Sequence, residues 1–323
     1  MKHRILYIVP SLEIGGLEKV TISLANNLKR EGFETYICCI SCSGELACTL
    51  KEKDKLFVVG NRGRINISSI KYILDLTKKL SIDLIHSHEL PGLIYGIPVA
   101  MIRRIPIIYT KHGYFGSFQE NFIVRCIEKL FSRLVSEYVC VSNELKERMK
   151  KQLGLKDKKV TVIYNGVDIF PRTQSPPSDK DSQIIIGSIG RLTKVKNYSL
   201  LINAFEEIKE EYPNCSLQII GDGECRKKLD DLITQKSLSN CVHLAGYKID
   251  TIRYLENFDI FVLTSLHEGH SISLLEALSQ SKICLVSNVG GNNEIINDWE
   301  NGFLFESKNK EDLKEKHDRM LFQ

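Results

Sequence analysis

Charged side chains follow two apolar runs of strand length in the second half of the chain. Glu268 and Glu276 stand eight residues apart beyond one run, and Arg191 and Lys196 lie just beyond the other. Carboxylates suit the hydroxyl groups of a sugar, whereas Arg and Lys side chains suit the oxygens of a leaving diphosphate. The combination indicates chemistry on a nucleotide sugar.

Two more candidate sites lie in the first half. Gly15 and Gly16 precede a helical pattern, where backbone amides could face phosphate oxygens, although paired glycines also suit any tight turn. His112 follows an apolar run, at a position where it could donate to a substrate hydroxyl or to a developing charge. A purely structural histidine is the alternative there.

Motifs for metal and dinucleotide sites are incomplete. His86 and His88 share one face of a strand, but no carboxylate or cysteine stands at a matching spacing. Ser271 replaces the second histidine of H-E-x-x-H, and the D-x-D spelling at 179–181 lies in a polar stretch with no strand before it. The nearest approach to G-x-G-x-x-G ends in Arg226, which disfavours a dehydrogenase. We therefore expect no metal and no other cofactor, so that side chains and amides neutralise the diphosphate.

An alternation of strands and helices must position these residues. Such alternation predicts doubly wound parallel sheets, and 323 residues suffice for two domains. We predict Rossmann-like domains at 1–170 and 183–323, a proline-rich linker at 171–182, and a central cleft at the carboxyl ends of both sets of strands. The predicted strands are 5–9, 35–40, 57–59, 84–86, 107–109, 138–141, 160–164, 184–189, 217–220, 242–244, 260–263 and 283–286.

The composition is typical of a folded cytoplasmic protein. Hydrophobic residues make up 43% and charged residues 26% of the chain. No apolar run approaches the roughly 20 residues of a membrane span, and the first run is too short for a signal peptide. The ten cysteines are scattered, often within apolar runs, and are expected to be reduced.

The net charge of +4 hides an asymmetry. Residues 1–172 carry 27 Lys and Arg against 17 Asp and Glu, or +10, and residues 173–323 carry 17 against 23, or −6. This pattern argues against a continuous groove for nucleic acid and favours an anionic surface that meets the first half. A helical stripe of Arg125, Lys129 and Arg133 beside apolar residues could lie on an anionic membrane, or the apolar face could pack on the sheet.

Short motifs occur in a fixed order along nearly the whole chain. They are Gly15-Gly16-Leu17-Glu18, Thr110-Lys111-His112-Gly113, Val141-Ser142, Asn165-Gly166-Val167-Asp168, Gly190-Arg191-Leu192-x3-Lys196-Asn197, Glu268-Gly269-x6-Glu276-Ala277 and Gly290-Gly291-Asn292-x-Glu294. In these motifs the chain resembles the family-four retaining glycosyltransferases of bacterial polysaccharide synthesis. The resemblance implies a GT-B fold, with an acceptor-binding first domain and a donor-binding second domain.

The resemblance also implies roles for single residues. Glu268 would contact the hydroxyls of the donor sugar and Glu276 would hold the ribose. Arg191 and Lys196 would bind the diphosphate, and His112 would reach the sugar under attack. The backbone amides of His270, Ser271 and Ile272 would cover the sugar and phosphates, and the loop with Gly246 and Tyr247 would contact the base.

The implied reaction retains the anomeric configuration through attack on the same face, with the leaving phosphate accepting the proton. Glu268 as a covalent nucleophile is the alternative. His270 stands where an apolar residue is usual in the family, and Ser271 stands where proline is common, so the donor preference could be unusual. The family usually continues with a crossover helix, which we expect to be short or absent because the chain stops at Gln323.

The sequence therefore predicts a retaining, metal-independent hexosyltransferase. Its donor would be a UDP-, GDP- or ADP-sugar, and its acceptor a glycan or a lipid-linked saccharide, at the inner face of the cell membrane. Two alternatives stay open. One is a nucleotide-sugar epimerase of the same fold, and the other is a non-catalytic protein that binds sugar nucleotides.

Overall fold

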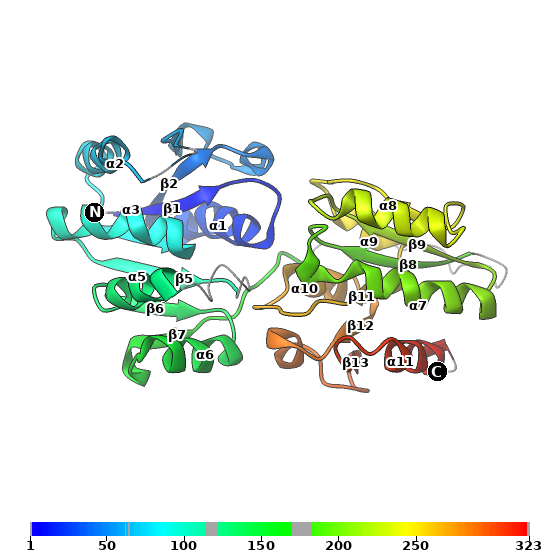
Figure 1. The fold of residues 1–323 in the computed structure, drawn as a ribbon. Helices are drawn as coiled ribbons and strands as arrows, with labels where there is room; N and C mark the ends of the chain where they lie inside the picture. Colours follow the sequence, from blue (N-terminus) through cyan, green and yellow to red (C-terminus); the bar gives the residue numbers. More distant parts are fainter. Residues whose placement is uncertain (1, 62, 64, 114–121, 170–182, 322–323) are drawn as a thin grey trace. The chain divides into compact units, whose positions relative to one another are not determined.

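The computed structural model describes residues 2–61, 63, 65–113, 122–169 and 183–321. The chain divides into two compact units, residues 1–165 and 166–323, and each is built on one parallel sheet (Figure 1). The predicted linker at 171–182 lies outside the described residues. The predicted cleft between the domains stays a prediction.

The first unit contains a seven-stranded sheet in the order β3-β2-β1-β4-β5-β6-β7. Helices cover both of its faces, so the sheet is doubly wound, as predicted. The strands are β1 (His3–Ser11), β2 (Phe33–Cys42), β3 (Leu56–Val58), β4 (Leu84–His88), β5 (Ile107–Lys111), β6 (Glu137–Cys140) and β7 (Val160–Val162), and the helices are α1 (Gly16–Asn27), α2 (Ile67–Lys79), α3 (Glu89–Arg103), α5 (Phe122–Ser132) and α6 (Asn143–Leu153).

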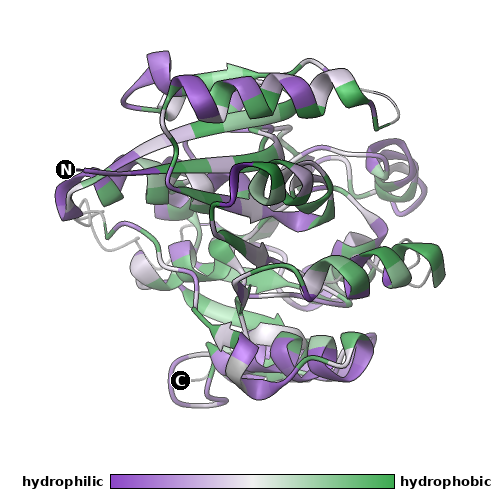
Figure 2. Cartoon of the chain, turned by 90° about the vertical axis from the view of Figure 1, so that its left-hand side faces the viewer, coloured by the Kyte–Doolittle hydropathy of each residue, from purple (hydrophilic) through white to green (hydrophobic). Residues whose placement is uncertain are grey.

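Alternate residues of each central strand enter two different cores. In β1, Leu6 and Ile8 join the core under α2 and α3, whereas Tyr7 and Val9 join the core under α1. A strand buried on both faces must be apolar at nearly every position, which explains the continuous apolar runs. The helices carry hydrophobic and hydrophilic bands because only one side of each faces the sheet (Figure 2).

Helix α3 has no counterpart among the predicted elements. Its sequence contains Gly92, Gly96 and Pro98, which oppose a helix in an isolated peptide. The structure explains the glycines, because a Cβ atom on Gly92 would lie 2.5 Å from the carbonyl oxygen of Ile8 and one on Gly96 would lie 2.4 Å from Ser87 Oγ. Close packing of α3 on the sheet therefore outweighs the weak propensity.

The second unit contains a six-stranded sheet in the order β10-β9-β8-β11-β12-β13. The predicted strands of this half are present, and β13 is additional. The strands are β8 (Ile184–Ile189), β9 (Cys215–Ile220), β10 (Val242–Leu244), β11 (Ile260–Leu263), β12 (Ile283–Ser287) and β13 (Phe303–Phe305), and the helices are α7 (Tyr198–Glu211), α8 (Arg226–Gln235), α9 (Ile252–Asn257), α10 (Ile272–Ser279) and α11 (Lys310–Leu321).

Each sheet reverses its strand order once. The reversal lies between β1 and β4 in the first unit and between β8 and β11 in the second. Loops that leave neighbouring strands in opposite directions open a crevice at the carboxyl ends, where doubly wound sheets bind ligands. The candidate residues Lys196 and Glu268 follow β8 and β11, so they flank the reversal of the second sheet.

Within the described ranges, no helix combines the length and apolarity that a bilayer crossing requires.

Candidate functional site

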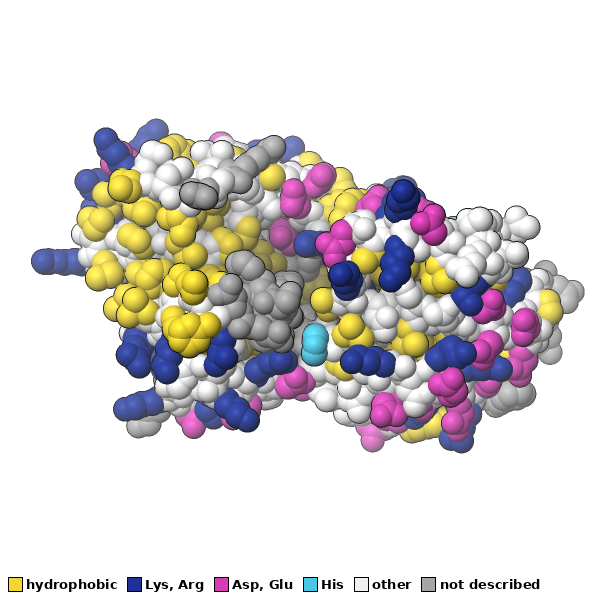
Figure 3. All heavy atoms as spheres, viewed as in Figure 1, with side chains coloured by type: hydrophobic (Ala, Val, Ile, Leu, Met, Phe, Trp, Pro, Cys, Tyr) yellow, Lys and Arg dark blue, Asp and Glu magenta, His cyan; other side chains and the backbone are white. Residues whose placement is uncertain are grey.

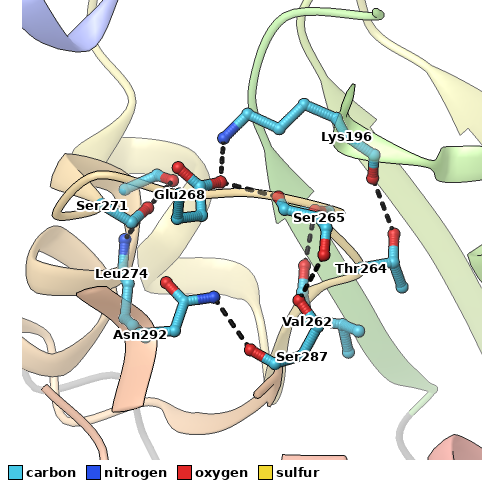
Figure 4. A network of polar contacts seen from close by, with 11 residues as sticks. Lys196, Val262, Thr264, Ser265, Glu268, Ser271, Leu274, Ser287 and Asn292 are labelled. Atoms are coloured by element: carbon cyan, nitrogen blue, oxygen red, sulfur yellow. Dashed lines mark hydrogen bonds and ion pairs between the residues drawn. The ribbon is translucent and has the colours of Figure 1, made fainter. Parts of the chain in front are cut away.

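Lys196 and Glu268 meet where the second sheet reverses its strand order. Lys196 ends a short 3₁₀ helix, η5 (Lys194–Lys196), and Glu268 lies in the loop between β11 and α10. Lys196 Nζ lies 2.5 Å from Glu268 Oε1, and the two side chains remain 19% and 12% exposed. Figure 4 shows the lysine reaching across to the carboxylate from the neighbouring loop. The structure thus brings together one cation and one carboxylate, both in partial reach of solvent.

The end of β11 fixes the backbone that carries Lys196. Thr264 Oγ1 donates to the carbonyl oxygens of Lys196 and Asn197, at 2.9 and 3.1 Å. The amide of Leu266 donates to the carbonyl of Val195 at 2.7 Å. Asn197 has a left-handed backbone, with φ at 50°, which turns the chain directly from η5 into α7. The lysine therefore sits on a turn that is held at several points.

A chain of serines and an asparagine positions Glu268. Ser265 Oγ donates to Glu268 Oε1 at 2.6 Å, and the carbonyl of Ser265 accepts from Ser287 Oγ at 2.7 Å. Asn292 Nδ2 in turn donates to the carbonyl of Ser287 at 3.1 Å (Figure 4). Ser265 and Ser287 are not among the residues predicted from the sequence. Their only signal is that small polar residues follow or end apolar strands.

Two glycines allow the next loop to pack against the backbone of Glu268. Gly290 has φ at +55°, and a Cβ atom there would lie 1.9 Å from the carbonyl oxygen of Glu268. A Cβ atom on Gly291 would lie equally close, 1.9 Å, to the carbonyl oxygen of Gly269. The 3₁₀ helix η6 (Gly290–Glu294) can therefore approach the glutamate loop only with glycine at both positions.

Helix α10 begins beside Glu268 with a capped N-terminus. Ser271 is the N-cap, and its hydroxyl oxygen accepts from the amide of Leu274 at 3.4 Å. His270 is buried, and this burial lowers the pKa of its imidazole. The first amides of α10, beginning with Ile272, end a helix dipole that favours negative charge nearby.

The other predicted donor residues lie around the same sheet edge. Glu276 is buried on α10, where its Oε2 accepts from Thr251 Oγ1 at 3.0 Å, in a hydrogen bond separate from the Lys196 pair. Arg191 is exposed just after β8. Gly246 and Tyr247 follow β10; Gly246 has φ at +72°, and Tyr247 is 43% exposed. Their assignment to phosphate, ribose and base stays a prediction.

In the first unit, the predicted glycines and histidine also follow strands at the carboxyl edge. Gly15 is the N-cap of α1, and Gly16 is its first residue. His112 follows β5, and its Nε2 lies 2.7 Å from Nδ1 of His88. Burial, reinforced by neighbouring charges, lowers the pKa of His112 to about 3, and burial lowers that of His86 to about 4. These imidazoles are therefore neutral near pH 7.

A buried ion cluster supports the backbone beside His112. Lys111 is 0% exposed, and its Nζ lies 3.2 Å from Glu89 Oε2 and 3.1 Å from Glu128 Oε1. Glu128 also accepts hydrogen bonds from two buried tyrosines, Tyr109 and Tyr138. Glu89 and Glu128 lie in α3 and α5, so no spacing along the sequence indicates that they pair with Lys111. Among the described residues, no group of three or more His, Cys, Asp or Glu is placed to hold a metal ion.

Comparison with known proteins identifies the family. The family described as Glycosyltransferase Family 4 matches residues 14–169, and Glycosyl transferases group 1 matches residues 171–322. The UDP-Gal:alpha-D-GlcNAc-diphosphoundecaprenol alpha-1,3-galactosyltransferase of Escherichia coli is 30% identical over an aligned length of 316 residues, and the match covers 91% of this chain and 81% of that protein. The chain is a family-four glycosyltransferase.

Further relatives agree with this membership. The O-antigen biosynthesis glycosyltransferase WbnH of Escherichia coli is 28% identical over an aligned length of 322 residues, and the match covers 98% of this glycosyltransferase and 89% of WbnH. The crystal structure of Anabaena Alr3699/HepE in complex with UDP and glucose matches with a TM-score of 0.86 at 21% identity, over 99% of this chain and 90% of that one. The predicted GT-B fold and family are confirmed, and the enzyme transfers a sugar from a nucleotide sugar.

Proposed function

We propose that this glycosyltransferase moves a hexose from a UDP-sugar to a lipid-linked saccharide in the assembly of a surface polysaccharide. The observation that carries the proposal is the contact of Lys196 with Glu268 at the reversal of the second sheet. The name of the Escherichia coli galactosyltransferase supports a UDP-sugar and a diphosphoundecaprenol-linked acceptor, and the HepE structure contains UDP and glucose.

The ion pair has the chemistry that a nucleotide sugar requires. A bound diphosphate would attract the ammonium group of Lys196, and Arg191 offers a second cation on the same loop. Glu268 would then accept hydrogen bonds from the sugar hydroxyls, while Ser265 continues to hold its carboxylate. Stabilising the charge that grows on the leaving diphosphate is the step that accelerates transfer.

We assign the reaction to attack on the same face of the sugar, with retention of configuration and without a protein nucleophile. Glu268 Oε1 already contacts both Lys196 and Ser265, so these two side chains occupy the oxygen that a nucleophilic attack would use. The leaving phosphate would accept the proton of the attacking hydroxyl. Glu276 is assigned to the ribose and His112 to the transferred sugar, and no step in this scheme requires a metal ion.

We also propose that the first unit contacts an anionic membrane through α5. The apolar residues of this helix divide between two sides, because Val124, Ile127 and Phe131 pack on the core whereas Phe122 and Ile123 are 77% and 66% exposed. The exposed apolar side chains of α5, of Leu134 shortly after it, and of the neighbouring end of α3 are termed the membrane face. They are Met101, Ile102, Phe122, Ile123, Leu130 and Leu134.

Basic residues accompany the membrane face. Arg125, Lys129 and Arg133 are exposed on or just after α5. Figure 3 shows hydrophobic side chains gathered on this view of the first unit, with Lys and Arg side chains below them and others at the upper left. An apolar strip beside cations is the pattern of a surface that binds anionic lipid head groups. A lipid-linked acceptor would then be presented at the same surface.

A transfer assay tests the proposed function. The purified enzyme would be incubated with UDP-galactose or UDP-glucose and GlcNAc-diphosphoundecaprenol in anionic vesicles. We expect one of the two donors to yield a disaccharide-lipid with an α linkage. A product with inverted configuration, or an altered donor formed without any acceptor, would contradict the proposal, and the second result would indicate an epimerase.

A further inference from the structure

His88 is a buried histidine whose role the proposed chemistry does not include. It lies at the end of β4, and its ring stacks between those of His86 and His112, at centroid distances of 4.4 and 5.0 Å. Tyr7 packs on the rings of His86 and His88 from β1, with its centroid 5.2 Å from that of His86 and 5.7 Å from that of His88. Because His88 Nδ1 lies 2.7 Å from His112 Nε2, one of these nitrogens must carry a hydrogen and the other a lone pair.

His112 is held by its backbone as well as by its ring. Its amide donates to Glu89 Oε1 at 2.9 Å, and the other oxygen of Glu89 lies 3.2 Å from Lys111 Nζ. His86 is fixed in turn, because its Nε2 lies 2.7 Å from Thr110 Oγ1. The backbone of His112 and the neighbouring His86 are thus fixed by hydrogen bonds, and the ring of His112 is held by its contact with His88.

The surroundings of His88 decide which nitrogen carries the hydrogen. Within the described part of the chain, His88 Nε2 is buried and has no hydrogen-bond partner. A buried N–H without an acceptor is rarer in proteins than an acceptor without a donor. The hydrogen of His88 thus belongs on Nδ1, from which it is donated to Nε2 of His112. The hydrogen of a neutral His112 must then lie on its own Nδ1.

We propose that His88 is a positioning residue that holds His112 as the neutral Nδ1–H tautomer. His112 thereby offers an N–H donor to a hydroxyl of the transferred sugar, which rests on the role of His112 in the proposed function. A neutral donor suits this place because the sugar ring gains positive charge in a glycosyl-transfer transition state, which a cation would oppose. Burial keeps the pKa of His112 low, which agrees with a neutral ring.

Nitrogen NMR of the full-length enzyme tests the tautomer without any activity. Histidine would be ¹⁵N-labelled, and the ring signals of His112 would be assigned by their loss in His112→Gln. Two-bond proton–nitrogen couplings distinguish Nδ1–H from Nε2–H. We expect the Nδ1–H pattern at pH 7, and the Nε2–H pattern or an imidazolium pattern would overturn the inference.

Two substitutions at His88 then separate positioning from packing. His88→Asn keeps an N–H donor near the place of Nδ1, whereas His88→Phe keeps the stacked ring and removes the donor. We expect His88→Phe to lose the fixed tautomer and to lower kcat roughly 10- to 100-fold with little change in KM, and His88→Asn to stay close to wild type. Equal behaviour of the two variants would overturn the inference. If the wild-type enzyme transfers no sugar, the proposed function fails, and the tautomer spectra still decide the inference.

Discussion

At the residue scale, the candidate site depends on the ion pair of Lys196 and Glu268. Both residues could be predicted from the sequence, but the hydrogen bonds that hold them in place could not. Lys196 and Glu268 were predicted because charged residues follow apolar strands in a recognisable order. The bond from Ser265 to Glu268 and the bond from Ser287 to Ser265 depend on how three loops pack, which no spacing along the chain encodes. The ion pair of Lys111 could not be predicted either, because its partner Glu128 lies on another element, the helix α5.

Lys196→Ala should lower kcat/KM roughly 100- to 1000-fold, because it removes a cation placed to stabilise the leaving diphosphate. The melting temperature should change little, since the side chain is partly exposed. Lys194→Ala is the matched control, because Lys194 is exposed at the start of the same turn. Steady-state kinetics on the two variants measures the difference, and similar losses in both would argue for a general effect of positive charge.

The stability of the first unit should depend on its buried histidines. Burial lowers the pKa of His86 from 6.5 to about 4, so below pH 6.5 the unfolded chain binds a proton that the folded chain excludes. The full unfolding free energy is therefore present above pH 6.5, and the part that depends on a neutral His86 is lost as the pH falls toward 4. Each such histidine contributes up to about 1.4 kcal/mol per pH unit within this window.

Urea unfolding of wild type and His86→Phe between pH 7.5 and 4.5 checks this dependence. The variant keeps an aromatic ring in the stack but loses the bond to Thr110, so it should be less stable than wild type at pH 7.5. The informative quantity is the slope, which should be shallower in the variant below pH 6.5. Parallel curves would show that folding does not lower the pKa of His86.

At the element scale, strands were easier to predict than the helices and loops that pack on them. The central strand β11 is buried on both faces and is an unbroken apolar run in the sequence. Helix α3 was not predicted, because its glycines lower the helix propensity of the segment. They are needed for close packing on the sheet, which the local sequence does not reveal. Gly290 is also required by a tertiary contact. Its motif is visible in the sequence, but its contact with the Glu268 loop could not be predicted.

Gly290→Ala should disturb the Glu268 loop and nearly abolish transfer. Its left-handed backbone disfavours any side chain, and the added methyl group would collide with the carbonyl oxygen of Glu268. We expect a loss of roughly 2–4 kcal/mol of unfolding free energy, from the backbone strain and the collision together.

Gly32→Ala is the control for Gly290→Ala. Gly32 has φ at +85°, but nothing lies within 4 Å of the added Cβ atom. This variant should lose only about 1 kcal/mol, from the left-handed backbone alone, and should keep its activity. Thermal unfolding and initial rates compare the two, and equal effects would refute the role assigned to the glycine contact.

At the scale of the whole molecule, the uneven distribution of charge agrees with the proposed contact of the first unit with a membrane. The net charge of +10 on residues 1–172 was visible in the sequence. The exposure of Phe122 and Leu130 was not, because an apolar helix face can equally be buried against a sheet. Only the packing of α5 shows which part of its apolar surface is covered by the core and which part is exposed.

The enzyme should float with phosphatidylglycerol vesicles at low salt and be released as the salt concentration rises, because screening weakens contacts between exposed charges. Arg125→Glu/Lys129→Glu should abolish this binding. Lys78→Glu/Lys79→Glu removes the same amount of charge from exposed positions at the end of α2 and should bind nearly as wild type. Equal losses in both double variants would mean that net charge, and not the membrane face, governs binding.

Calorimetric titration of UDP and of the transferred UDP-hexose into wild type, Lys196→Ala and Glu268→Gln tests the central claim most directly. The claim is that Lys196 binds the diphosphate while its partner Glu268 binds the sugar. Lys196→Ala should therefore weaken both ligands, whereas Glu268→Gln should weaken the UDP-hexose and leave UDP unchanged or tighter. If Lys196→Ala binds UDP as wild type does, or if Glu268→Gln weakens both ligands equally, this assignment of the site is wrong.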